Sequence, residues 1–71
     1  MNEIKSIIAK NIAELRQAVG MTQLELAELL GIDRSHMSAI ELATVGVSLD
    51  VIFKLCRVLD VKPAALFDFR D

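Results

Sequence analysis

The sequence predicts an all-helical domain made of five short helices. Apolar residues recur at intervals of three and four along most of the chain, residues that cap helices separate these stretches, and no alternation typical of a strand appears. At 71 residues the chain has room for one domain, which we expect to span residues 1–71. The apolar share of 54% exceeds the roughly 45–50% of ordinary soluble domains, so we expect some apolar side chains to meet a partner chain.

The first helix is predicted from an apolar stripe near the start of the chain. Its members recur every three or four residues, which places them on one face of a helix. They are Ile4, Ile7, Ile8, Ile12, Leu15 and Val19. Gly20 follows the stripe and can adopt the left-handed conformation that ends a helix.

The second helix is predicted from a capping box. The hydroxyl of Thr22 can accept a hydrogen bond from the helix start, and Glu25 stands three residues further on, so that two unpaired amide groups are satisfied. The helix should run to about Leu30. Gly31 follows, where the chain must reverse within a few residues.

A third helix should begin after Asp33, which can cap it, and continue through Glu41. Ala27 and Gly31 are small enough for the second and third helices to pack steeply across their short turn. We expect the buried side to carry Leu26, Leu30, Ile32, Met37 and Ile40. The outer side of the third helix then carries Arg34, Ser35, Ser38, Ala39 and Leu42. This is the layout of a helix-turn-helix that reads DNA.

The fourth and fifth helices complete the predicted domain. Ser48 can cap a helix whose inward stripe would be Leu49, Ile52, Phe53, Cys56 and Leu59. Pro63 suits the first turn of a short helix from Ala64 to about Phe67, because its missing N–H costs nothing there.

A second apolar stripe on the fourth helix predicts self-association. Its members, with the two phenylalanines that follow, are Val51, Leu55, Val58, Phe67 and Phe69. A monomer has little reason to expose all of these side chains. We therefore expect a twofold-symmetric homodimer built from the fourth and fifth helices.

Several classes of protein are disfavoured by the sequence. The single cysteine, Cys56, cannot form an internal disulfide, and no secretory leader opens the chain, so we expect a cytoplasmic location. No apolar run is long enough to span a membrane. No metal-ligand cluster, phosphate-binding loop or catalytic motif appears, and we expect neither a cofactor, a metal, a small-molecule substrate nor an enzymatic activity.

The chain resembles the Cro/repressor-like, or XRE-type, helix-turn-helix regulators. The matching residues are Leu15-Arg16, Gly20-Met21-Thr22-Gln23, Glu25-Leu26-Ala27, Leu30-Gly31, Met37-Ser38 and Ile40-Glu41. The segment from Asp33 to Glu41 is especially similar to controller proteins of restriction-modification systems. The resemblance implies a compact, five-helix repressor-like fold and a transcriptional regulator that binds double-stranded DNA at a palindromic operator.

The resemblance also implies roles for particular residues. Gln23 would meet a backbone phosphate, and Arg34, Ser35 and Ser38 would approach base edges and nearby phosphates, with His36 and Ala39 completing the DNA-binding set. Arginine can present a forked donor to guanine, which makes Arg34 the main candidate for specificity. Arg16 and Glu41 would form an internal ion pair instead of contacting DNA.

The sequence departs from the family just after the third helix. Family members often carry basic residues there, whereas this chain has the apolar segment Leu42 to Val47, and its net charge is −2. Phosphate neutralisation supplies much of the affinity for DNA. We therefore expect the affinity of this chain for DNA to be modest, or to be supplied by two subunits together. The alternatives are a protein-interaction module that kept the fold and lost DNA binding, and an antitoxin.

Overall fold

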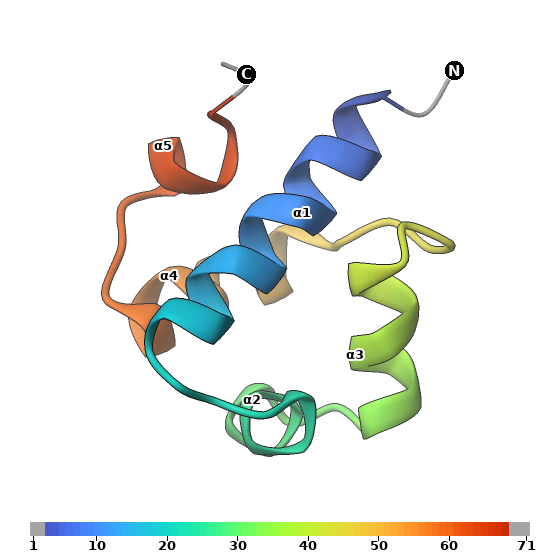
Figure 1. Cartoon of the computed structure of the whole chain (residues 1–71), viewed down its shortest axis with the longest axis vertical. Helices are drawn as coiled ribbons and strands as arrows, with labels where there is room; N and C mark the ends of the chain where they lie inside the picture. The colour runs from blue at the N-terminus through green and yellow to red at the C-terminus, as the bar shows by residue number, and fades with distance from the viewer. Residues whose placement is uncertain (1–2, 69–71) are drawn as a thin grey trace.

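The computed structural model describes residues 3–68, and within them the chain forms five helices and no strand. These are α1 (Glu3–Ala18), α2 (Gln23–Leu30), α3 (Arg34–Glu41), α4 (Leu49–Leu59) and α5 (Pro63–Leu66). The predicted all-helical class and the order of the five helices are confirmed. In Figure 1, α1 runs across the middle of the domain, and α3 stands at one edge.

Side-chain caps begin three of the helices where the sequence predicts them. Thr22 and Glu25 form the reciprocal capping box of α2, with the Thr22 hydroxyl accepting from the Glu25 N–H at 3.0 Å and the Glu25 carboxylate accepting from the Thr22 N–H at 2.8 Å. The carboxylate of Asp33 caps α3, and the hydroxyl of Ser48 caps α4. Each cap satisfies an amide that the helix itself leaves unpaired.

The core lies where α1, α2, α3, α4 and α5 converge. Side chains that are at most 1% exposed form its centre: Ile12, Leu26, Ala27, Leu30, Met37, Ile40, Leu55 and Leu66. The predicted buried side of the α2–α3 pair is therefore confirmed, except that Ile32 is only half-buried. The two ends of the α1 stripe are exposed, at 62% for Ile4 and 53% for Val19, because no other helix covers them.

The predicted faces of α4 are partly wrong, although Ile52, Cys56 and Leu59 of the predicted inward stripe do face the core. Val51 and Leu55, assigned above to an exposed dimer stripe, are core residues with 8% and 0% exposure, and Val58 packs half-buried against the same core. Leu49 and Phe53, assigned to the core, are 81% and 61% exposed.

The error has a simple geometric reason. Both stripes of α4 have helical spacing, so periodicity alone cannot say which one faces inward. The arc that faces the core is centred on Leu55 and has Ile52, Cys56 and Leu59 at its sides. Phe67 is 38% exposed, and Phe69 lies outside the described residues.

An asparagine that the sequence analysis did not single out fixes α5 against α1. The Asn11 side-chain amide donates to the carbonyls of Leu66 at 2.9 Å and Asp68 at 3.1 Å. One carbonyl belongs to the last residue of α5 and the other follows the helix, whose four residues form few hydrogen bonds of their own. Among residues 3–68, no helix is both long and apolar enough to span a bilayer.

Candidate nucleic-acid interface

A polar clamp holds the inner side of α3. It consists of Arg16, Gln23, Glu41 and the carbonyl of Met21. Arg16 Nε donates to Glu41 Oε2 at 2.7 Å and Nη2 donates to Oε1 at 3.0 Å, so the fork of the guanidinium meets both carboxylate oxygens. Nη1 donates to the Met21 carbonyl at 2.7 Å. The clamp therefore joins the end of α1, the α1–α2 turn and the end of α3.

The Arg16–Glu41 pair is shielded from water. The two side chains are 11% and 6% exposed. Hydrogen bonding to Glu41 raises the pKa of Arg16 above its ordinary value, against the opposing effect of burial, so the guanidinium stays charged. The structure thus contains the internal Arg16–Glu41 ion pair that the family resemblance implies.

Gln23 is part of the clamp, a feature that the sequence analysis did not anticipate. Its Nε2 donates to Glu41 Oε1 at 3.0 Å, which fixes the amide at the start of α2. An amide nitrogen carries two hydrogens, so one donor remains beyond this bond. The phosphate contact of Gln23 stays a prediction.

The outer face of α3 consists of Ser35, Ser38, Ala39 and Leu42. Each of these residues lies three or four positions from at least one other, and together they occupy one side of the helix, opposite the buried Met37. Ser35 and Leu42 are exposed, and Ser38 and Ala39 are half-buried.

Arg34, which was predicted on the outer side, lies instead beside the outer face near the start of α3, as does His36, and both side chains are exposed. The backbone N–H of His36 donates to the Asp33 carboxylate at 2.7 Å, so the His36 main chain forms part of the helix cap. Within residues 3–68, no side-chain hydrogen bond or ion pair occupies Arg34, Ser35, His36 or Ser38. These donors and acceptors are therefore available to a ligand.

The end of α3 is closed by a Schellman motif. Ala43 adopts a left-handed conformation with φ 62°, and its N–H donates to the Ile40 carbonyl at 3.1 Å. The Thr44 N–H donates to the Ala39 carbonyl at 3.0 Å, and the Thr44 hydroxyl donates to the same oxygen at 3.1 Å. These bonds fix the backbone on both sides of Leu42, which is 71% exposed.

Three of the seven lysines and arginines among residues 3–68 have partners away from α3. Lys10 lies 3.9 Å from Glu14, Lys54 lies 3.3 Å from Asp50, and the Arg57 guanidinium lies 5.7 Å from the ring centroid of Phe53. Arg16 belongs to the clamp. Arg34 is the basic side chain of α3 itself, as the sequence suggested.

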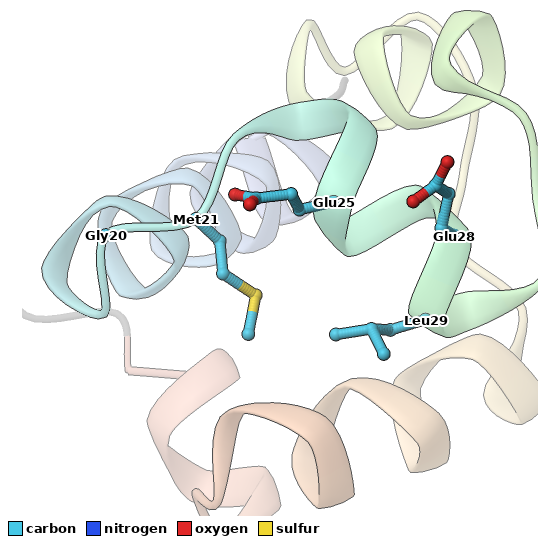
Figure 2. A pocket seen from close by; sticks show the side chains of 5 residues that line it. All are labelled: Gly20, Met21, Glu25, Glu28 and Leu29. Carbon is cyan, nitrogen blue, oxygen red and sulfur yellow. The ribbon is translucent and has the colours of Figure 1, made fainter.

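A shallow hollow lies beside the α1–α2 turn, and Figure 2 shows the five residues that line it. Met21 and Leu29 point into it and supply apolar surface, while Glu25 and Glu28 place two carboxylates at its rim. None of the predicted DNA-binding residues lines this hollow, so it is separate from the outer face of α3.

The short turn, the buried α2–α3 seam and the exposed outer face of α3 define a helix-turn-helix protein. The chain belongs to the Helix-turn-helix family, which matches residues 12–66. It is therefore a member of the XRE-type transcriptional regulators, a family of DNA-binding proteins and not of enzymes.

The similarity to restriction-modification controllers is confirmed by individual relatives. Control protein C.BamHI of Bacillus amyloliquefaciens is 35% identical over 69 residues, which cover 96% of this chain and 85% of the relative. The crystal structure of the restriction-modification controller protein C.AhdI from Aeromonas hydrophila superposes with a TM-score of 0.82 at 40% identity, covering 87% of this chain and 94% of C.AhdI.

A third relative carries a different name. Antitoxin PezA of Streptococcus pneumoniae is 40% identical over 55 residues, or 78% of this chain. Those residues make up 35% of PezA, so the chain spans about a third of that protein's length.

Proposed function

We propose that this chain regulates transcription by binding a palindromic operator as a homodimer, with α3 of each subunit in the major groove. The observation that carries the proposal is the contrast around α3. Its inner side is fixed by the core and the polar clamp, while the polar side chains on its outer side have no partner among the described residues. A rigid helix with available donors suits base recognition, because little order has to be created on binding.

Each side chain has a contact that its chemistry supports. Arg34 donates two hydrogen bonds to O6 and N7 of a guanine, and Ser35 and Ser38 add contacts that discriminate less between bases. Gln23 and the first amides of α2 bind a backbone phosphate and set the orientation of the domain. His36 is exposed at the edge of this surface and is a candidate for a further phosphate contact.

The homodimer uses the outward side of α4, in place of the buried stripe predicted from the sequence. Leu49 and Phe53 are large, exposed and one turn apart, and Ile52 is half-buried next to them. Phe67, at 38% exposure, remains a candidate at the end of α5. To bind two half-sites one turn of DNA apart, such a dimer has to hold its two α3 helices about 34 Å apart. Each subunit has a net charge of −2, and pairing two subunits compensates for the small number of phosphate contacts that each one makes.

The test of DNA recognition is selection from a pool of random duplexes at low and moderate salt, followed by sequencing of the bound fraction. We expect an enriched motif with two inverted half-sites whose centres are one helical turn apart. Failure to enrich any motif, together with no binding at low salt, would overturn the proposal in favour of a protein-interaction module.

The dimer has its own test. Sedimentation of the wild-type chain at tens of micromolar should give a dimer, and Phe53→Ser should shift it toward monomer and weaken binding to the full palindrome. Leu29→Ala is the control, because it removes another exposed apolar side chain, 57% exposed, from α2. A wild-type monomer, or a Phe53→Ser variant that stays dimeric, would contradict this interface.

An antitoxin is the second candidate, favoured by the similarity to PezA. The controller relatives C.BamHI and C.AhdI are matched over most of their own length, whereas PezA is matched over 35%. The resemblance to PezA therefore concerns the helix-turn-helix part, and we favour the regulator. Copurification of a stoichiometric partner protein from the native host, in place of operator binding, would reverse this preference.

A further inference from the structure

Two apolar side chains on the outer face of α3 have no role in the core. Leu42 is 71% exposed at the end of the helix, and Ala39 lies three positions before it on the same face. Ser35 and Ser38 flank them, and none of the four outer-face residues carries a charge. This part of α3 is therefore suited to an uncharged, partly apolar ligand surface and poorly suited to phosphate.

The position of Leu42 is set by the fold. The Leu42 N–H donates to the Ser38 carbonyl at 2.9 Å, and the bonds from Ala43 and Thr44 hold the chain that follows. An apolar group presented on a fixed backbone makes a defined contact without the cost of ordering a loop.

We propose that Ala39 and Leu42 together read the 5-methyl group of a thymine in each half-site. This inference rests on the proposed function, and it names the base that this part of α3 prefers. In the major groove the thymine methyl is the apolar group that distinguishes an A·T pair, and alanine and other apolar side chains recognise it by contact. The operator therefore carries an A·T pair where Ala39 and Leu42 meet the groove.

Deoxyuracil tests this contact, because it pairs like thymine and lacks only the methyl group. The selected operator is prepared as a series of duplexes, each with one symmetry-related pair of thymines replaced, and titrated with the wild-type chain. At one position in each half-site we expect the replacement to weaken binding about fourfold, the effect of removing one buried methyl group. Other positions should change less than twofold.

Two variants assign the effect to this surface. Leu42→Ala should bind more weakly and lose most of its sensitivity to deoxyuracil at that position. Leu29→Ala removes an exposed leucine of α2 and should keep the full sensitivity. Circular dichroism and urea unfolding check that both variants are folded.

Each outcome of the series is decisive. An operator without an A·T pair facing Ala39 and Leu42, no sensitive position, or equal sensitivity in Leu42→Ala and wild type would each overturn this inference while leaving the proposed function standing. A chain that binds no duplex would overturn the proposed function, and the thymine contact with it.

Discussion

The inner and outer sides of α3 meet different surroundings, although they belong to the same eight residues. On the inner side, Met37 and Ile40 are buried and Glu41 accepts hydrogen bonds from Arg16 and Gln23. On the outer side, Ser35 and Ser38 make no hydrogen bond through their side chains within residues 3–68. The difference teaches that the fold constrains one side of this helix and leaves the other to be set by the ligand.

The largest expected effect comes from removing the clamp. Glu41→Ala leaves the shielded Arg16 guanidinium without its carboxylate, and we expect the free energy of unfolding to fall by about 3 kcal/mol. Urea unfolding followed by circular dichroism measures the loss. Because a domain of this size has little stability to spare, Glu41→Gln, which keeps one acceptor, provides a milder variant.

The control for the clamp is an exposed ion pair. Lys10 and Glu14 lie 3.9 Å apart and are 68% and 62% exposed. Glu14→Gln should change stability by about 0.5 kcal/mol or less, because water screens such pairs. Similar losses for Glu14→Gln and Glu41→Ala would contradict the distinction between the two sides of α3.

Replacing Arg34 should affect DNA binding and leave folding stability unchanged, whereas replacing Glu41 should lower stability. Arg34→Ala should cost about 1–3 kcal/mol in binding to the selected operator and relax the preference at one base pair, with no measurable loss of folding stability. Binding titrations against single-base variants of the operator measure both effects. Lys62→Ala removes an equal charge from the connection between α4 and α5 and serves as control. Equal weakening of Arg34→Ala on every sequence would reassign Arg34 to the phosphate backbone.

The smallest effect concerns the residue that closes α3. Ala43 has φ 62°, a conformation that costs a side-chain-bearing residue about 1–2 kcal/mol and glycine almost nothing. Part of this gain is offset because glycine makes the unfolded chain more flexible, so Ala43→Gly should raise the free energy of unfolding by about 0.5–1 kcal/mol.

The reverse change provides the matched comparison. Gly31 ends α2 with φ 76°, and a Cβ placed there would meet no atom within 4 Å. Gly31→Ala should therefore destabilise the domain through backbone strain alone, by about 1 kcal/mol. Thermal unfolding of the two variants should move in opposite directions. A shift of the same sign in both would show that contacts, and not φ, control these positions.

The sequence predicted features that depend on local chemistry. The caps at Thr22, Asp33 and Ser48 and the glycine at Gly31 act within one turn of helix, so neighbouring residues suffice to identify them. The side of α4 that faces inward was mispredicted, because both of its stripes have helical spacing and the choice depends on how α2 and α5 are placed around it.

Contacts between distant residues were beyond the same reasoning. Asn11 bonds to carbonyls more than 50 positions away, and nothing next to it in the sequence signals this. The contact between Gln23 and Glu41 likewise depends on the angle between α2 and α3. Residues of the outer face present a different difficulty, because no contact within residues 3–68 tests the DNA contacts predicted for them.

One carboxylate oxygen limits how this domain can be redesigned. Glu41 Oε1 accepts from both Arg16 and Gln23, so any replacement of Gln23 also alters the support of α3. The side chains at positions 35, 38, 39 and 42 do not take part in the clamp. A library that varies these four positions and keeps Gln23 unchanged should therefore yield many folded variants with new sequence preferences, whereas a library that includes position 23 should yield fewer.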